Sequence, residues 1–257
     1  MSAPRLVGVG VGPGDPQLLT LAGLAELRAA SRVYVPVLAL AEKGRAETVV
    51  RAHLDGRTVE RLSFALNHDI DGPQARRHRH WDAAAATVAA QLNEHGSTVA
   101  FATIGDPNIY STFGYLAATV RELVSGLEVH TVPGITAMQA AASAAGITLV
   151  EGAEPLTLLP LTRDTAVLRE RLAAGGTVVA YKGGRRIAEL RELIDAVGAT
   201  GRAVYAEHLG TPDERVSALA ELEPAQSEEP GSEEGAGRPY LSTVVVLPKR
   251  DGRGEQL

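Results

Sequence analysis

Cysteine is absent from the 257 residues of this chain, and aromatic residues account for only 4% of them. The absence of cysteine excludes disulfide bonds, thiol nucleophiles and cysteine-ligated zinc or iron–sulfur centres. The 7 histidines are scattered without metal-ligand spacing, so the sequence predicts no metal site. The shortage of aromatic residues, with abundant alanine and valine, indicates cores built from small aliphatic side chains.

Long apolar runs and an excess of basic charge are missing as well. No window approaches the roughly 20 apolar residues of a membrane span, and the N-terminus leads directly into a strand-like segment. We therefore expect a cytoplasmic protein without a membrane partner. The formal net charge of −6 argues against nucleic acid as a partner, although a local basic pocket could still bind an anionic small molecule.

Short valine-rich runs alternate with alanine- and leucine-rich stretches at helical spacing, which predicts an α/β fold with mostly parallel or mixed sheets. Strands are expected at residues 6–11, 32–36, 98–104, 128–132, 156–161, 177–182, 202–207 and 241–247. Helices are expected at residues 18–30, 46–53, 74–95, 109–125, 137–145, 165–174 and 187–197, and from 211 onward.

The length permits one large domain or two small ones. For two domains we place the boundary after residue 128, which gives an N-terminal α/β domain of residues 1–128 and a C-terminal α/β domain of residues 129–257. The segment 223–239 differs from the rest, because it is acidic, rich in proline and glycine, and lacks apolar periodicity. Such a segment buries too little apolar surface to offset its ordering entropy, so we expect a flexible, solvated loop there.

A glycine-rich turn at residues 8–16 follows the first expected strand and precedes a helix. It fails the Gly-x-Gly-x-x-Gly spacing of dinucleotide-binding folds, because Pro13 or Asp15 occupies the last position. Its glycines would let a ligand approach the backbone, and Pro13 stiffens the turn. Asp15 is either a functional carboxylate or the N-cap of the following helix, and the turn alone leaves both roles open.

Two later turns repeat this pattern, Gly105-Asp106-Pro107 and Pro133-Gly134, each after an expected strand. Because ligands of open α/β sheets bind beyond the carboxyl ends of the strands, the three turns together predict one cleft. They carry hydroxyls and small residues but little cationic charge, and the phosphate-binding Gly-x-x-x-x-Gly-Lys motif is absent. A nucleoside with an amino-acid tail fits such turns better than a polyphosphate.

The same turns carry a family resemblance. Residues 10–20, 105–110 and 132–137 resemble the signatures of the tetrapyrrole (corrin/porphyrin) methylases, and the match of order and spacing extends over nearly the whole chain. The run Tyr-Ser-Thr-Phe-Gly-Tyr at 110–115 further resembles the group that methylates C20 of precorrin-2. One departure is Ala22, where relatives often carry lysine, and another is Pro36-Val37, which replaces an Asp–basic pair of members that methylate uroporphyrinogen.

The resemblance implies an S-adenosylmethionine-dependent C-methyltransferase that acts at C20 of precorrin-2, or of its cobalt complex, in corrin (cobalamin) biosynthesis and releases S-adenosylhomocysteine. It implies two α/β domains with the methyl donor in the cleft between them, the N-terminal domain on the macrocycle side, and a homodimer. Carried over by motif, the donor contacts are Pro13, Ile104, Gly105, Asp106, Ile109, Thr136, Ala137, Leu161, Lys182, Leu209, Leu241 and Ser242. Gly12 and Tyr110 are expected at the macrocycle.

A polycarboxylate tetrapyrrole needs cationic partners, since arginine–carboxylate hydrogen bonds are strong. The densest basic cluster contains Arg76, Arg77 and Arg79, and a second candidate contains Lys182, Arg185 and Arg186. The alternative for either cluster is a solvated helix face.

Methyl transfer is an in-line attack by a ring carbon on a sulfonium methyl, so the enzyme mainly positions the reactants and excludes water. If a ring proton must be removed, Asp15 is the first candidate base and His208 the second, with a structural role as the alternative for His208. Three other interpretations stay open. The chain could be a family member that acts on another corrin intermediate, on diphthine or on ribosomal RNA. It could instead be a non-catalytic nucleoside-binding module, or the glycine turns could be purely structural.

Overall fold

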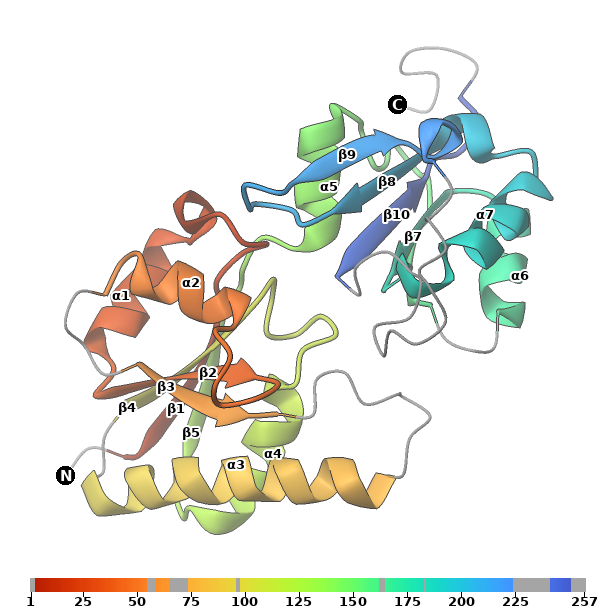
Figure 1. The fold of residues 1–257 in the computed structure, drawn as a ribbon. Helices are drawn as coiled ribbons and strands as arrows, with labels where there is room; N and C mark the ends of the chain where they lie inside the picture. The colour runs from red at the N-terminus through yellow and green to blue at the C-terminus, as the bar shows by residue number, and fades with distance from the viewer. Residues whose placement is uncertain are drawn as a thin grey trace. The chain divides into compact units, whose positions relative to one another are not determined.

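The computed structural model describes residues 3–54, 59–64, 74–95, 98–161, 165–182, 184–223 and 241–250, and for residues 74–80, 95 and 185 it describes the backbone only. The chain divides into two compact units, Met1–Thr136 and Ala137–Leu257, which run from red to green and from green to blue in Figure 1. This boundary lies later than the one expected at 128/129, because the strand Glu128–Val132 pairs with the first strand of the chain.

The first unit is built on a parallel five-stranded sheet in the order β3-β2-β4-β1-β5. Its strands are β1 (Arg5–Gly10), β2 (Arg32–Val37), β3 (Val59–Ser63), β4 (Thr98–Thr103) and β5 (Glu128–Val132). Its helices are the short 3₁₀ helix η1 (Pro16–Leu18), α1 (Leu21–Ala29), α2 (Arg45–Arg51), α3 (Gln74–His95) and α4 (Phe113–Leu123). Because the strands are parallel, their carboxyl ends share one edge of the sheet.

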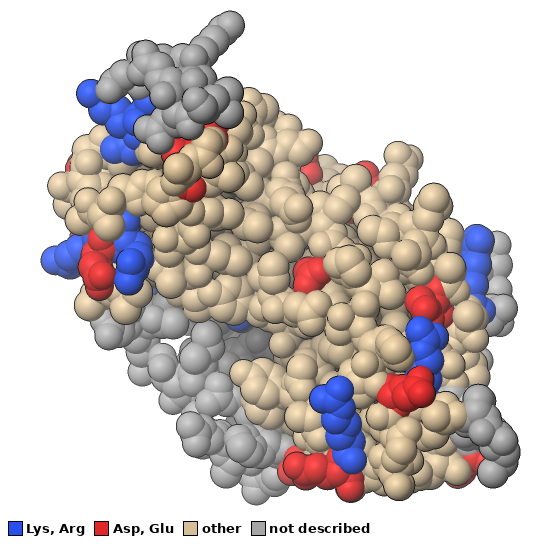
Figure 2. Space-filling model, turned by 180° about the vertical axis from the view of Figure 1, so that it is seen from behind, with Lys and Arg blue, Asp and Glu red and all other residues tan. Residues whose placement is uncertain are grey.

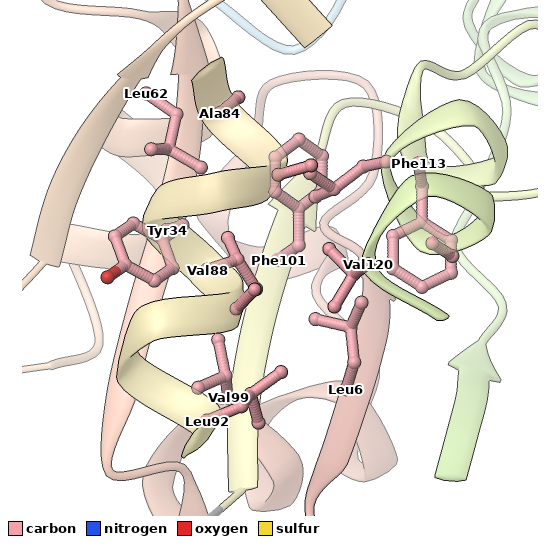
Figure 3. Close-up of a cluster of buried hydrophobic side chains, with 14 of the residues drawn as sticks. Leu6, Tyr34, Leu62, Ala84, Val88, Leu92, Val99, Phe101, Phe113 and Val120 are labelled. Carbon is pink, nitrogen blue, oxygen red and sulfur yellow. The ribbon is translucent and has the colours of Figure 1, made fainter. Parts of the chain in front are cut away.

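Apolar side chains cover both faces of this sheet. On one face, α3 and α4 pack against Leu6, Tyr34 and Phe101, as Figure 3 shows. On the other face, Leu27 of α1 and Val49 of α2 are buried in a cluster with valines of β1 and β2. These clusters consist mostly of alanine, valine and leucine, as the composition indicated.

A buried carboxylate ties α2 to the edge strand β3. Glu47 is 1% exposed and accepts hydrogen bonds from Nε of Arg51 and Nε of Arg61, each at 2.7 Å. Burial raises the pKa of Glu47, but the two guanidinium groups outweigh this effect and hold the pKa below its ordinary value. Arg61 also donates to the carbonyl of Leu40 at 2.9 Å, so the cluster fixes the segment that follows β2.

The second unit contains a mixed five-stranded sheet in the order β6-β7-β10-β8-β9, in which β6 and β7 are parallel and the other pairs antiparallel. Its strands are β6 (Leu156–Pro160), β7 (Thr177–Tyr181), β8 (Ala203–Glu207), β9 (Arg215–Ala218) and β10 (Ser242–Val246). Its α-helices are α5 (Ala137–Ala145), α6 (Ala166–Ala174) and α7 (Ile187–Asp195), with 3₁₀ turns η2 (Gly184–Arg186), η3 (Thr200–Arg202) and η4 (Leu219–Glu221). Helix α5 packs on one face of the sheet, and α6 and α7 pack on the other.

Three sequence expectations differ from the fold. The helix expected from residue 211 onward is wrong, because residues 211–214 form a turn and β9 then pairs with β8. Helix α4 begins at Phe113 instead of 109, since the preceding turn extends through Tyr110. The short strand β3 was not predicted. The solvated loop expected at 223–239 lies outside the described residues from position 224 onward.

On the face of the molecule in Figure 2, acidic and basic side chains lie next to one another. Ion pairs of this kind within the described ranges include Arg5 with Glu26, at 2.9 Å between Nη1 and Oε2. Among the helices that the structure describes, none has the length and apolar character needed to cross a membrane.

Candidate functional site

The three glycine-bearing turns follow β1, β4 and β5, which are neighbours in the first sheet. All three leave the sheet at its carboxyl edge, which is the edge where open α/β folds bind ligands. Hydrogen bonds join these turns to one another, whereas the ligand cleft expected at them stays a prediction.

The first and second turns are joined through their backbones. The N–H of Gly105 donates to the carbonyl of Gly12 at 2.8 Å, and the N–H of Gly12 donates back to Gly105 at 3.4 Å. Both glycines have left-handed backbones, with φ of +79° at Gly12 and +71° at Gly105, so side chains would be strained there. The glycines are thus required by the way in which the two turns meet.

The second and third turns are joined by Asp106, which is buried. Its Oδ2 accepts a hydrogen bond from the backbone N–H of Gly134 at 3.0 Å, and its Oδ1 accepts one from the N–H of Asn108 at 2.8 Å. Both carboxylate oxygens therefore shape the backbone of the site. Asn108 adds a further link through Nδ2, which donates to Oγ1 of Thr131 at 3.3 Å.

Close packing explains two more glycines. A Cβ placed on Gly134 would lie 2.2 Å from the carbonyl oxygen of Gly105, and one placed on Gly10 would lie 2.6 Å from the nitrogen of Gly134. Both distances are far below a permitted contact, so the backbones of the three turns touch directly. The three segments therefore meet through their main chains.

Asp15 lies at the end of the first turn and is half-buried. Its Oδ1 accepts a hydrogen bond from the N–H of Gln17 at 2.8 Å, which confirms the capping role left open by the sequence. The cap belongs to η1, and α1 has its own N-cap in Thr20. Nε2 of His53 lies 2.8 Å from the carbonyl oxygen of Pro16 and holds η1 from the side of α2.

In the first unit, the turns thus bring together most of the residues that the sequence singled out there: Gly12, Pro13, Ile104, Gly105, Asp106, Ile109, Tyr110 and Thr136. Thr136, which is buried, ends this unit, and Ala137 begins α5 in the next. The side chains of Arg76, Arg77 and Arg79 lie outside the described residues, although the backbone there belongs to α3.

A second group of expected site residues gathers at one edge of the sheet in the second unit. The N–H of Leu161 donates to the carbonyl of Tyr181 at 2.7 Å, and the N–H of Lys182 donates to the carbonyl of Ser242 at 3.0 Å. Ser242 is in turn the register partner of Glu207, the residue before His208 and Leu209. The ends of β6, β7 and β8 and the start of β10 therefore carry the expected site residues of this unit: Leu161, Lys182, His208, Leu209, Leu241 and Ser242.

Three residues with side chains have positive φ, and each was singled out from the sequence. They are Tyr110 (φ 48°), Lys182 (φ 64°) and His208 (φ 53°). A left-handed backbone disfavours any residue with a Cβ by about 1–2 kcal/mol. Such strained residues cluster at functional sites in proteins. The carboxyl edge of the first sheet, near Tyr110, and the edge of the second sheet, near Lys182 and His208, are therefore both candidate sites.

Two polar groups at the second edge stand out by their burial. Ser242 Oγ is buried and has no hydrogen-bond partner within the described part of the chain. Glu207, also buried, accepts a hydrogen bond from the Tyr205 hydroxyl at 2.6 Å. Sequence reasoning missed Glu207, although an acidic residue ending an apolar strand was a signal that could have identified it.

The second basic cluster is only partly described. Arg186 donates from Nε to Oε2 of Glu189 at 2.7 Å, so its charge is paired on α7. The side chain of Arg185 lies outside the described residues. In the described ranges, no three His, Asp or Glu side chains are grouped so that they could hold a metal ion.

Comparison with known proteins gives a consistent picture. The family model for tetrapyrrole (corrin/porphyrin) methylases matches residues 5–223. The Sinorhizobium "Precorrin-2 C(20)-methyltransferase" is 35% identical over 247 residues, which cover 94% of each chain. The "Probable cobalt-precorrin-2 C(20)-methyltransferase" of Methanocaldococcus jannaschii is 39% identical over 160 residues, and this match spans 62% of the present chain and 65% of that relative.

The fold is shared with solved structures of lower identity. A cobalamin synthesis related protein, CobF, from Corynebacterium diphtheriae superposes with a TM-score of 0.68 at 20% identity, covering 96% of the present chain and 99% of that one. At this identity the likeness establishes the fold alone.

Proposed function

Because the chain belongs to the tetrapyrrole (corrin/porphyrin) methylases, we propose that it transfers the methyl group of S-adenosylmethionine to C20 of precorrin-2 or of its cobalt complex. The observation that carries the proposal in the structure is the convergence of the three turns at Gly12, Asp106 and Gly134. The named relatives support the choice of C20 within the family.

The residues present fit S-adenosylmethionine as the donor. A Cβ on Gly105 would meet nothing within 4 Å among the described residues, so this turn leaves open space beside its backbone, where a nucleoside with an amino-acid tail could approach closely. In the second unit, the Ser242 hydroxyl is buried and has no hydrogen-bond partner among the described residues, so a bound ligand could satisfy it. When bound, S-adenosylmethionine supplies an electrophilic sulfonium methyl group.

Methyl transfer needs little acid–base catalysis from the protein. The bond from C20 to the methyl carbon forms as the sulfur–methyl bond breaks, sulfur keeps the electron pair, and C20 then loses its proton. Rigid turns hold the reactants in line and exclude water, which is the main source of acceleration in such a transfer. Asp15 takes up the ring proton in this proposal, while its Oδ1 keeps the cap on Gln17.

Macrocycle carboxylates dock on basic side chains of the first unit. The N-terminal part of α3, with Arg76, Arg77 and Arg79, supplies them, and Gly12 and Tyr110 lie at the ring. Charge-assisted arginine–carboxylate pairs contribute about 1.5–3 kcal/mol each, so a few of them would dominate docking. We further propose that the enzyme works as a homodimer in the cytoplasm, which light scattering and cell fractionation test.

The direct test incubates the purified protein with S-adenosylmethionine and either precorrin-2 or its cobalt complex. We expect the mass gain of one methyl group, carbon NMR that places it at C20, and release of S-adenosylhomocysteine. Methylation at another ring position would assign the chain to a different step in corrin synthesis. Binding of S-adenosylhomocysteine without any methylated product would instead identify a nucleoside-binding module.

A further inference from the structure

A buried carboxylate, Glu207, ends strand β8 beside the first residue of β10. The antiparallel register pairs Glu207 directly with Ser242, so both side chains project from the same face of the sheet. Both residues are buried, at 3% exposure each. A buried carboxylate is costly unless it is hydrogen-bonded.

Neighbouring side chains fix the orientation of Glu207. The Tyr205 hydroxyl, on the same strand and the same face, donates to its Oε2 at 2.6 Å. Nη1 of Arg215, on β9, lies 3.8 Å from its Oε1. The arginine already offsets the negative charge of this carboxylate, so the group best suited to approach it is a neutral hydrogen-bond donor rather than a second cation.

The backbone around this pair is strained on both sides. Lys182 donates its N–H to the carbonyl of Ser242 at 3.0 Å with a left-handed φ of 64°, and His208, directly after Glu207, has a φ of 53°. Ser242 itself keeps a buried hydroxyl without a partner in the described residues. Strain and an unsatisfied polar group at one point indicate a site completed by a ligand.

We propose that Glu207 and Ser242 form one acceptor site for a neutral O–H or N–H edge of the donor's nucleoside. This inference rests on the proposed function and names the group that anchors the donor in the second unit. Two parts of the nucleoside carry this chemistry, the vicinal ribose hydroxyls and the exocyclic amine of adenine. A carboxylate beside a hydroxyl matches either, and Tyr205 keeps the carboxylate aligned for it.

Calorimetric titration with S-adenosylhomocysteine tests the site. We expect Glu207→Gln to weaken binding at least about tenfold and Ser242→Ala about three- to tenfold. Glu170→Gln, an exposed position on α6, is the matched control and should bind as the wild type does. Circular dichroism melting of each variant establishes that it is folded before binding is compared.

For Ser242→Ala we also expect an effect on stability, opposite in sign to its effect on binding. Without ligand, Ser242→Ala should melt about 2–4 °C higher than the wild type, because it removes an unsatisfied buried hydroxyl. A hydroxyl with a purely structural role would instead lower the melting temperature and leave donor affinity unchanged. This variant keeps the proposal testable even if Glu207→Gln fails to fold.

Two donor analogues locate the bonded group. S-inosylhomocysteine lacks the adenine amine, and 2′-deoxyadenosylhomocysteine lacks one ribose hydroxyl. The analogue that loses affinity for the wild type but loses little for Glu207→Gln identifies the partner of the carboxylate. If neither penalty changes in the folded variant, or if both variants bind S-adenosylhomocysteine as tightly as the wild type, the inference is overturned; a wild type that binds no donor overturns the proposed function instead.

Discussion

The side chain of Asp106 reaches from the turn after β4 to the backbone nitrogen of Gly134 in the turn after β5, with 3.0 Å between Oδ2 and N. This bond and the paired glycines Gly12 and Gly105 join three segments that are far apart in the sequence. The site in the first unit is therefore built mainly from main-chain contacts, and its geometry depends on a few residues that shape the backbone.

Replacement of Asp106 by asparagine tests this dependence. Both oxygens of Asp106 accept backbone N–H groups, whereas an asparagine would turn an NH₂ group toward one of them. We expect the free energy of unfolding to fall by about 1.5–3 kcal/mol in urea titrations, and donor affinity to fall with it. Asp82→Asn, at an exposed position of α3, is the control, and equal behaviour of the two variants would contradict this role for Asp106.

Two glycine-to-alanine variants should have opposite effects. Gly134→Ala forces a Cβ to within 2.2 Å of the Gly105 carbonyl, so we expect it to be destabilised by about 1–3 kcal/mol or more and to bind S-adenosylhomocysteine poorly. Gly114→Ala lies in α4 with nothing within 4 Å of the added carbon, and it should gain up to about 1 kcal/mol. Denaturant midpoints compare them, and a Gly134→Ala protein of wild-type stability would refute the close packing of the turns.

The two roles of Asp15 can be separated by a pair of substitutions. Asparagine can still accept the N–H of Gln17, so Asp15→Asn retains the cap but cannot take up a proton. If Asp15 is the base, turnover of this variant falls about 100-fold or more while donor affinity and melting temperature hold. Asp15→Ala loses the cap as well, at about 0.5–2 kcal/mol. Unchanged turnover in Asp15→Asn leaves capping as the only role of the residue.

The only tryptophan of the chain, Trp81 on α3, stacks on Tyr115 of α4 with ring centroids 4.4 Å apart and ring planes at 10°. Tyr115→Phe should keep this stack, whereas Tyr115→Ala should shift the tryptophan emission and cost about 0.5–1.5 kcal/mol of stability. Because the stack ties α3 to α4, we also expect the alanine variant to raise the KM for the macrocycle with little change in donor affinity. An unchanged KM would favour the interpretation of the arginine cluster as a solvated helix face.

The pair formed by Glu154 and Arg250 predicts an acid-sensitive contribution to stability. Arg250 donates from Nε and Nη2 to the two carboxylate oxygens at 2.8 and 2.6 Å, and these bonds lower the pKa of Glu154 from 4.5 to about 2. A carboxyl group whose pKa is depressed on folding stabilises the protein above its unfolded pKa and loses that effect as the pH falls toward the folded value. The stability difference between wild type and Glu154→Gln should thus be constant near neutrality and vanish between about pH 4.5 and 2. Urea midpoints across this range, with Glu170→Gln as the reference, check it, and a pH-independent difference would contradict it.

The turns of the first unit could be predicted because their requirements are local. Gly105-Asp106 and Pro133-Gly134 each combine the end of a strand with residues that few other structures tolerate, and parallel strands bring such ends to one edge. Which side chain would bridge the turns was not predictable, because the bond from Asp106 to Gly134 joins residues 28 positions apart.

Other features depend on pairing between distant segments. Strand β10 inserts between β7 and β8, and this placement makes Ser242 the neighbour of both Lys182 and Glu207. Nothing local to residues 242–246 indicates it. For the same reason β9 was mistaken for the start of a helix, since its pairing with β8 decides its conformation and its own four residues do not.

Tyr110, Lys182 and His208 all occupy backbone conformations that glycine adopts without strain. A chain optimised for thermal stability alone would carry glycine at each position. Glycine would relieve about 1–2 kcal/mol of backbone strain per position, and the higher conformational entropy of the unfolded chain would offset part of this gain. These three positions are therefore the first choice for raising thermostability by substitution with glycine. At the same positions we expect a gain in stability to reduce methyltransferase activity.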